Sequence, residues 1–278
     1  MDAQGTRAQT RPGIGLALGG GVIYTIAGIG VFRVLEEAGM PISAVSGTSG
    51  GAIIGSAIAA GLTAAEIERV ARKLRWTQLA WPIPGRLGLL NGSPISRFVE
   101  RLTGCRDISE LRIPFTAVCA DVTTGEEVRF TDGPLGMAVQ GSCCIPGLFQ
   151  PVCWEHRLLV DGGIVDNVPV EAVREHRPLL VVAVDVLSFF EGSHGQLKLG
   201  MQVVLKAYQM MVKRISESQE RRADMVIKPN VAGCSYASFR DVPKLIERGE
   251  EAMRAVLPRL RAMLEEHESG GPPLAWEA

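Results

Sequence analysis

The chain has 278 residues, of which 46% are hydrophobic, 5% aromatic and 21% charged, and its 29 basic and 30 acidic side chains give a net charge of −1. This length predicts one large domain or at most two small ones. The balanced charge excludes a typical nucleic-acid-binding protein, which needs a basic face, and the evenly spread charge excludes a multispanning membrane protein.

The first part of the chain alternates between strand and helix patterns. Residues 1–12 are polar and lack the hydrophobic region of a signal peptide, so we expect a disordered leader and, by default, a cytoplasmic location. Residues 13–18 form an apolar run typical of a buried strand, and 23–38 have near-helical spacing. A second strand at 42–47 and a small-residue helix at 50–61 follow. This order predicts a parallel sheet with helical crossovers.

The remaining sequence continues this mixture of elements. Thr63 and Glu66 have the spacing of a capping box. The further predicted elements are a helix at 64–75, an apolar loop at 76–92, a helix at 93–103, a strand pair at 114–122 and 126–130, a helix at 134–141, a hairpin leading into a strand that ends at Asp161, a strand at 179–186, a helix at 197–219, a strand at 225–229 and a helix at 241–266 kinked by Pro258. No repeat, linker or domain boundary is visible, which predicts one domain over 13–266 and a flexible tail at 267–278.

Glycine is the unusual component, with 32 residues, many of them clustered between 13 and 61. Gly19, Gly20 and Gly21 follow the first strand, where free backbone N–H groups at the start of a helix would form an oxyanion hole. A dinucleotide-binding loop is the alternative. The GxGxxG pattern fails at Tyr24, however, and there is no P-loop, so nucleotide binding is the weaker interpretation.

Ser49 lies in the sequence Gly47-Thr48-Ser49-Gly50-Gly51, a GxSxG motif between a predicted strand and a predicted helix. This is the setting of a nucleophile elbow, in which small neighbours such as Gly47 and Gly51 allow a strained turn that presents the serine hydroxyl. The alternative is a glycine-rich turn with a serine N-cap. The position between strand and helix favours the nucleophile.

A serine nucleophile needs a base. None of the four histidines (His156, His176, His194 and His267) follows a predicted strand end, so each is interpreted as a surface side chain. Asp161 instead ends a predicted strand and is followed by Gly162 and Gly163, which permit close approach. If its strand is parallel to the others, Asp161 and Ser49 meet at one edge of the sheet. An ordinary Asp-Gly turn is the alternative for Asp161.

The six cysteines include no CxxC pair and no histidine at zinc-ligand spacing, so no metal or other cofactor is expected. Cys119 and Cys153 lie in apolar runs, where a reduced cysteine behaves as a small hydrophobic side chain.

With these motifs in order, the chain resembles the patatin-like phospholipases, in particular their compact bacterial members. The resemblance covers about 14–265 and is carried by LGGGVIYTIAGIGV (18–31), GTSGG (47–51), VCADVTTGEEVRF (118–130), GSCCIPGLFQPV (141–152), VDGGIVDNVPV (160–170) and RISESQERRADMVIKP (214–229). It implies an α/β three-layer sandwich with a mostly parallel central sheet flanked by helices. It also implies a Ser49–Asp161 dyad that hydrolyses fatty-acyl esters of phospholipids or related lipids, with the oxyanion held by N–H groups around Gly20, Gly21 and Val22.

The chain departs from the family pattern in the glycine-rich loop. Members commonly have Arg and Gly where this chain has Tyr24 and Thr25, and often His in place of Gly28. The missing arginine removes a positive charge that would favour the oxyanion or a phosphate. Two alternatives to a hydrolase therefore stay open: a non-catalytic lipid-binding or regulatory relative, and an acyltransferase that uses the same acyl-enzyme.

Two further segments bear on the substrate, which we expect to be a lipid or another acyl ester. The apolar residues Trp76, Trp81, Pro82, Leu87, Leu89 and Leu90, flanked by Arg72, Lys73, Arg75 and Arg86, are compatible with an interfacial lid in transient contact with a membrane. Ordinary loop packing is the alternative. Met201, Met210 and Met211 with Tyr208 would suit a pliable acyl tunnel or, by default, a helical core.

Overall fold

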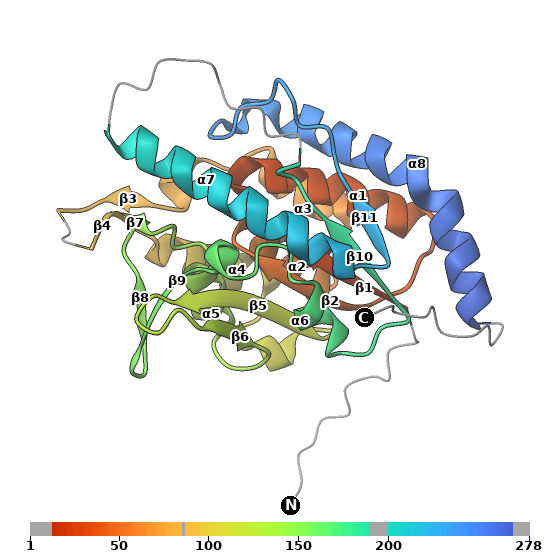
Figure 1. Cartoon of the computed structure of the whole chain (residues 1–278), viewed down its shortest axis with the longest axis horizontal. Helices are drawn as coiled ribbons and strands as arrows, with labels where there is room; N and C mark the ends of the chain where they lie inside the picture. The colour runs from red at the N-terminus through yellow and green to blue at the C-terminus, as the bar shows by residue number, and fades with distance from the viewer. Residues whose placement is uncertain (1–12, 85–86, 189–199, 269–278) are drawn as a thin grey trace, which may run out of the picture.

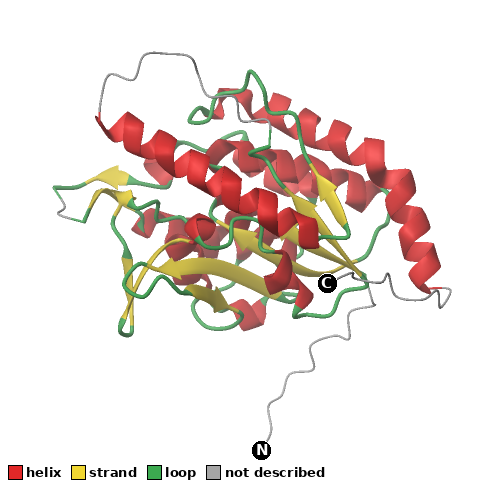
Figure 2. Ribbon diagram, in the orientation of Figure 1, coloured by secondary structure: helices red, strands yellow, loops and turns green. Residues whose placement is uncertain are grey.

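The computed structural model describes residues 13–84, 87–188 and 200–268. An eight-stranded sheet runs through the molecule between helices, and a three-stranded sheet lies beside it (Figures 1 and 2). The strands are β1 (Ile14–Leu18), β2 (Ile42–Thr48), β3 (Trp81–Pro82), β4 (Gly88–Asn91), β5 (Phe115–Asp121), β6 (Glu127–Phe130), β7 (Gly147–Phe149), β8 (Val152–Trp154), β9 (Arg157–Asp161), β10 (Leu180–Val184) and β11 (Met225–Ile227).

The large sheet has the order β11-β10-β1-β2-β5-β9-β8, with β6 also paired to β5. Its first five strands are parallel, as expected for strands joined by helical crossovers. The strands β6, β8 and β9 pair antiparallel with their neighbours. The prediction of an α/β fold with a mostly parallel central sheet is therefore confirmed.

The strands β2 and β9 lie end to end along one edge of β5. One edge of β5 pairs with β6 at residues 117–120. The other edge pairs with β2 at residues 117 and 118 and with β9 at residues 119 and 120. Thr48 is opposite Val118, and Asp161 is opposite Cys119. The two strands run in opposite directions and stop at neighbouring positions, so Ser49 and Asp161 are brought together there. The expectation that Asp161 ends a strand parallel to the others is wrong.

The helices connect and cover these strands. They are α1 (Ala27–Glu37), α2 (Gly50–Ala59), α3 (Ala64–Ala71), α4 (Ser93–Thr103), α5 (Leu135–Ser142), α6 (Val170–Arg174), α7 (Gly200–Gln219) and α8 (Val242–Glu268), with 3₁₀ turns η1 (Val22–Ile26), η2 (Trp76–Gln78), η3 (Ile108–Glu110), η4 (Gly162–Ile164), η5 (Glu220–Arg222) and η6 (Phe239–Asp241). The capping box predicted at Thr63 and Glu66 is present at the start of α3.

The two faces of the sheet contribute to two separate hydrophobic clusters. Ile14, Leu16 and Leu18 of β1 belong to the larger cluster, together with buried residues of α1, α2, α5 and α8. Ala17 belongs to the smaller cluster, which contains Val170 and Val173 of the short helix α6. This alternation is what a strand buried on both faces produces.

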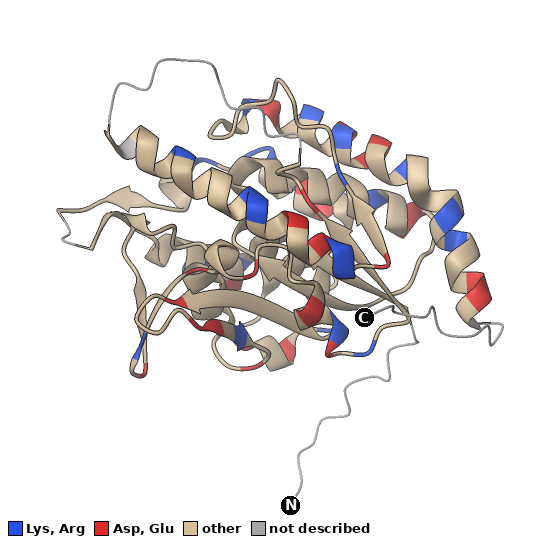
Figure 3. Ribbon diagram, viewed as in Figure 1, with Lys and Arg blue, Asp and Glu red and all other residues tan. Residues whose placement is uncertain are grey.

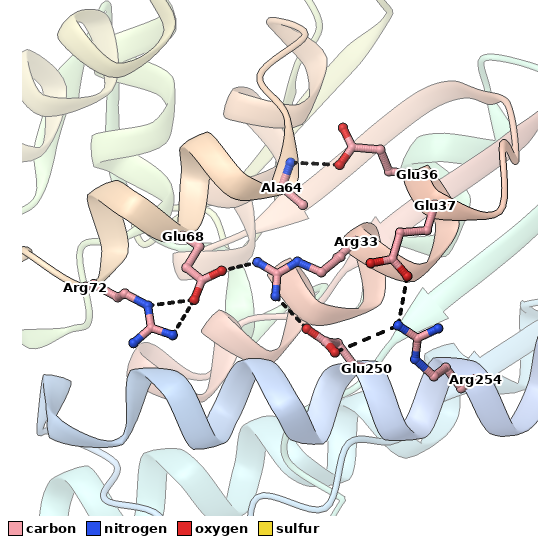
Figure 4. A network of polar contacts seen from close by, with 8 residues as sticks. All are labelled: Arg33, Glu36, Glu37, Ala64, Glu68, Arg72, Glu250 and Arg254. Atoms are coloured by element: carbon pink, nitrogen blue, oxygen red, sulfur yellow. Dashed lines mark hydrogen bonds and ion pairs between the residues drawn. The ribbon is translucent and has the colours of Figure 1, made fainter.

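Helices α1 and α8 pack so closely that the main chain of each lies against a glycine of the other. A Cβ atom added at Gly30 would lie 1.9 Å from the carbonyl oxygen of Ile246, and one at Gly249 would lie 1.9 Å from that of Ala27. Arg33 of α1 then pairs with Glu68 of α3 and, at 2.6 Å, with Glu250 of α8 (Figure 4). The helix beyond β11 is thus held closely to the helix that follows the first strand.

Several local predictions need correction. The predicted loop at 76–92 contains η2, β3 and β4. Helix α8 continues past Pro258 to Glu268, two residues into the predicted tail, and bends toward its end (Figure 1). Cys119 is buried as expected, but Cys153 is exposed. The predicted leader and residues 269–278 of the predicted tail lie outside the described residues. Among the helices that the structure describes, none is both long and apolar enough to cross a membrane.

Candidate active site

Ser49 occupies a strained turn between β2 and α2. Its φ of 55° and ψ of −128° are unusual for a residue with a side chain, and such a conformation costs on the order of 1–3 kcal/mol. The Ser49 N–H donates to Ser142 Oγ at 2.8 Å, and Ser142 Oγ donates to the Val118 carbonyl oxygen at 2.6 Å. These contacts hold the backbone of the turn, which has the geometry of a nucleophile elbow.

The two motif glycines around Ser49 are required by close backbone contacts. A Cβ at Gly47 would lie 2.5 Å from the carbonyl oxygen of Gly51, and one at Gly51 would lie 2.2 Å from that of Leu18. A side chain at either position would push α2 away from the sheet. The GxSxG spacing therefore follows from packing as well as from the conformation of Ser49.

Asp161 is 2% exposed and lies beside Ser49. Its Oδ1 accepts a hydrogen bond from the Gly163 N–H at 2.9 Å. Burial raises the pKa of Asp161 from 3.8 to about 6, while the neighbouring Ser49 hydroxyl, the Gly163 amide and the Tyr208 hydroxyl act in the opposite direction. The carboxylate is thus available at neutral pH as an acceptor for the Ser49 proton.

Gly162 and Gly163 let the segment after Asp161 approach its neighbours. A Cβ at Gly162 would lie 2.4 Å from the Val118 carbonyl oxygen. At Gly163 a Cβ would lie 3.0 Å from Tyr208 Oη and 3.1 Å from Asp161 Oδ1. Tyr208 of α7 is therefore a third member of the cluster. The sequence placed it only among residues suited to an acyl tunnel, and its contact with Asp161 depends on how α7 packs.

The glycine-rich loop after β1 is held from two sides. The Gly19 N–H donates to Val184 O at 3.0 Å, and the Gly20 N–H donates to Asn167 O at 3.2 Å. Within the described part of the chain, the N–H groups of Gly21 and Val22 have no acceptor. Because the Gly20 amide is already engaged with Asn167, the expectation that it serves as an oxyanion donor does not agree with this geometry.

Tyr24 and Thr25, which replace the family's Arg and Gly, have structural contacts of their own. The Tyr24 hydroxyl donates to Cys234 O at 2.9 Å, and its ring packs edge-on against Tyr236 at 5.1 Å. Thr25 Oγ1 donates to the Val22 carbonyl oxygen at 2.7 Å. Both side chains therefore fix the loop that carries the free amides.

A cavity of about 330 Å³ opens at Ser49. Its wall is almost entirely apolar, with residues from η1, α2, α3, α4, β7 and α7, including Val22, Ile53, Phe98, Ile145, Phe149 and Tyr208. No Lys, Arg or His is among the described residues that line it. Such a cavity suits an uncharged hydrocarbon chain, and its described wall has no cationic side chain for a phosphate.

The other predicted candidates lie elsewhere. His156 is exposed; the half-buried His176 shares a 2.8 Å hydrogen bond with Thr116 Oγ1, and His267 bonds to the carbonyl oxygen of Met263. The surface interpretation thus fits only His156, and His194 lies outside the described residues.

Met210 and Met211 are exposed, not part of a tunnel. In the described ranges, no group of three or more His, Cys, Asp or Glu side chains is placed to hold a metal ion.

Comparisons with known proteins find one matching family model and several similar sequences. A family model described as "Patatin-like phospholipase" matches residues 16–174. An uncharacterised NTE family protein of Mycobacterium tuberculosis is 29% identical over 272 residues, which cover 88% of this chain and 46% of that protein. The mouse protein named patatin-like phospholipase domain-containing protein 6 is 32% identical over 193 residues, 65% of this chain and 14% of that protein.

The crystal structure of VipD from Legionella pneumophila is similar in fold. It has a TM-score of 0.55 and 16% sequence identity, with 90% of this chain and 67% of that chain covered. The chain spans about half or less of the length of the curated relatives described above.

Proposed function

Because this chain belongs to the patatin-like phospholipase family, we propose that it is a serine acyl hydrolase that cleaves fatty-acyl esters of phospholipids, lysophospholipids or related lipids. The observation that carries the proposal is the placement of Ser49, on a strained turn, beside the buried carboxylate of Asp161 and at the opening of an apolar cavity. The reacting groups and the space for the acyl chain are thus contiguous.

The proposed reaction uses Ser49 as nucleophile and Asp161 as base. Asp161 accepts the proton of the Ser49 hydroxyl as Oγ attacks the ester carbonyl carbon. The negative charge that develops on the carbonyl oxygen is stabilised by the N–H groups of Gly21 and Val22 and by the amino-terminal end of α2. When the tetrahedral intermediate collapses, the alcohol leaves with the proton from Asp161, and the acyl group remains on Ser49.

Hydrolysis of the acyl-enzyme repeats these steps with water. Asp161 accepts a proton from water as its oxygen attacks the acyl carbon, and the proton then passes to Ser49 Oγ as the fatty acid is released. No other base is required by this scheme, which is consistent with the absence of histidine from the described cavity wall.

The cavity supports an acyl-chain specificity without a phosphate site. The headgroup of a phospholipid would remain outside, because the described lining residues include no cation that could compensate its charge. We therefore expect neutral acyl esters to be cleaved as well as phospholipids.

The substrate would be reached at a lipid surface. Trp76, Trp81, Leu87 and Leu89 are 38–61% exposed, and Trp76 also lines the cavity. Strands β3 and β4 carry no charged side chain (Figure 3), while Arg97 packs over the ring of Trp81. Aromatic and cationic groups at one site favour the headgroup region of a bilayer.

We place this reaction in the cytoplasm, where all six cysteines would remain unpaired as they are here.

The direct test is acid release from short-chain acyl esters by the purified chain and by Ser49→Ala. We expect the substitution to abolish release and to prevent labelling of the protein by a fluorophosphonate probe. Undiminished release by Ser49→Ala would exclude the proposed nucleophile.

The same assay separates the two alternatives. A lipid-binding relative without activity would bind lipid but show no labelling at Ser49. An acyltransferase would be labelled, and an added alcohol or lysolipid would compete with water for the acyl group.

A further inference from the structure

Tyr208 is the residue of α7 that faces the Asp161 carboxylate. Its hydroxyl interacts with Asp161, and both oxygens lie about 3 Å from the position that a Cβ of Gly163 would occupy. Tyr208 also lines the cavity onto which Ser49 opens. The tyrosine hydroxyl, the carboxylate and the serine are therefore grouped beside the cavity.

In the part of the chain that the structure describes, no positively charged group acts on Asp161. The titratable groups that act on it or respond to it are Cys119, Cys143, Cys144, Tyr208 and Tyr236. Burial and the nearby carboxylate raise the pKa values of these thiols and phenols, so all five stay protonated when Asp161 ionises. A buried carboxylate without a cation depends on hydrogen-bond donors for its stability.

Among the described residues, few groups are placed to donate to this carboxylate. The Gly163 N–H donates to Asp161 Oδ1 at 2.9 Å, and the neighbouring hydroxyls of Ser49 and Tyr208 lower the pKa of Asp161. In the proposed reaction the Ser49 proton is transferred and its bond to Asp161 changes at each step. Gly163 and Tyr208 are then the two donors that stay in place throughout.

We propose that Tyr208 is a positioning residue that donates a hydrogen bond to Asp161, orients the carboxylate toward Ser49 and keeps it ionised at neutral pH. This inference rests on the proposed function of Ser49 and Asp161. Tyr208 does not exchange a proton with substrate. It acts through the carboxylate alone.

The position of α7 does not depend on this hydroxyl. Farther along the helix, Ser216 Oγ accepts a hydrogen bond from Asn167 Nδ2 at 2.8 Å. Gln219 Oε1 accepts from the N–H groups of Asn167 and Val168 at 2.9 and 3.0 Å, and its Nε2 donates to the Val165 carbonyl oxygen at 3.0 Å. Because these bonds hold α7 against the segment after Asp161, Tyr208→Phe removes the hydroxyl and leaves the helix in place.

The test is the pH dependence of ester hydrolysis by the full chain and by Tyr208→Phe. A hydrogen bond to a charged group stabilises it by about 1.5–3 kcal/mol, so we expect kcat to fall roughly 10- to 100-fold. The pH below which kcat/KM declines, the acid limb of its pH profile, should rise by about 1 pH unit or more. KM for a short-chain ester should change little, since Phe keeps the ring in the cavity wall.

Tyr236→Phe is the matched control. Tyr236 lines the same cavity, but Gln209 acts on its hydroxyl, and Tyr236 is not among the groups that lower the pKa of Asp161. We expect its removal to leave the acid limb at the wild-type pH. An equal shift in both variants, or no shift in Tyr208→Phe, would overturn the inference for Tyr208.

A second measurement is independent of catalysis. Urea unfolding should show that Tyr208→Phe loses more stability at pH 8, where Asp161 is ionised, than at pH 4.5, where it is mostly protonated. An equal loss at both pH values would identify a purely structural residue and overturn the inference. If wild-type hydrolysis does not depend on Ser49, the proposed function fails, while this unfolding comparison still decides whether Tyr208 stabilises the carboxylate.

Discussion

The backbone N–H of Ser49 is bound by the side chain of Ser142, at 2.8 Å, and not by a backbone acceptor. The same hydroxyl donates to the Val118 carbonyl oxygen, beside the place where β2 and β9 meet. Ser142 thus connects the strained turn to the central strand β5.

Removing this hydroxyl should weaken both the fold and the turn. In Ser142→Ala the buried Ser49 N–H loses its acceptor, which costs about 1–3 kcal/mol. We expect a lower free energy of unfolding in urea and a kcat reduced several-fold for a short-chain ester. Ser56→Ala is the control, because the buried Ser56 hydroxyl donates only to Ile53 O in its own helix. Equal effects of both substitutions on kcat would show that Ser142 has no special part in holding Ser49.

Hydrolysis should fail in acid. The pKa of Asp161 is about 6, and its protonated form cannot accept the Ser49 proton. We therefore expect kcat/KM to fall tenfold per pH unit below about 6. The neighbouring thiols do not titrate there, since burial and the Asp161 charge raise the pKa of Cys144 to about 12. A rate that stays constant down to pH 4.5 would show that Asp161 is not the base.

Asp161→Asn should stabilise the chain at neutral pH while abolishing hydrolysis. Folding raises the pKa of Asp161 from 3.8 to about 6. The contribution of this group to the free energy of unfolding is therefore fully present below pH 4 and is lost as the pH rises through 6. At pH 7.5 the amide should raise the free energy of unfolding by up to about 3 kcal/mol. This advantage should nearly disappear at pH 4. Urea titrations at the two pH values measure it, and a gain of the same size at both would contradict the assigned cause.

Gly51→Ala should disrupt the site through backbone contact. The new Cβ would lie 2.2 Å from Leu18 O and 2.7 Å from Gly19 O, and neither atom can move without shifting β1 and the glycine-rich loop. We expect a loss of about 3 kcal/mol or more and no measurable hydrolysis. Gly28→Ala in α1 is the control, since its nearest neighbour is Leu18 Cδ2 at 3.5 Å. It should be neutral or stabilise by up to about 1 kcal/mol. A stable, active Gly51→Ala protein would refute the close packing of the turn.

The exposed tryptophans should contribute to lipid binding. Trp76→Ala combined with Trp81→Ala should reduce flotation with vesicles of phosphatidylcholine and phosphatidylglycerol. The effect should be absent in Val122→Ser, which alters an apolar residue that is 47% exposed but not part of the cavity wall. Unchanged flotation of the double variant would place the lipid contact elsewhere.

Much of the site could be predicted from short segments of sequence. The strained turn at Ser49 and the close approach at Gly162 depend on glycines within a few residues, so their local pattern indicated both positions. The boundaries of α4 agree with its predicted range of 93–103, because its apolar spacing and Pro94 at the first turn mark the helix clearly.

The long-range relationships could not be predicted in the same way. The direction of β9 is decided by its pairing with β5, which the apolar run at its own positions does not specify. Tyr208 lies outside the family match over 16–174, and its contact with Asp161 arises only when α7 packs on the segment after that residue. The engaged Gly20 amide likewise depends on Asn167, far along the chain.

The crossing of α1 and α8 bears on how mutational data for this chain should be interpreted. At Gly30 and Gly249 the opposing atoms belong to the main chain, so rotamer changes cannot make room for a side chain. A saturation mutagenesis scan would score both positions as intolerant as Gly47 or Gly51, although neither Gly30 nor Gly249 borders the cavity. High sensitivity at these two positions would therefore map a contact between two helices and should not be taken for a second ligand site.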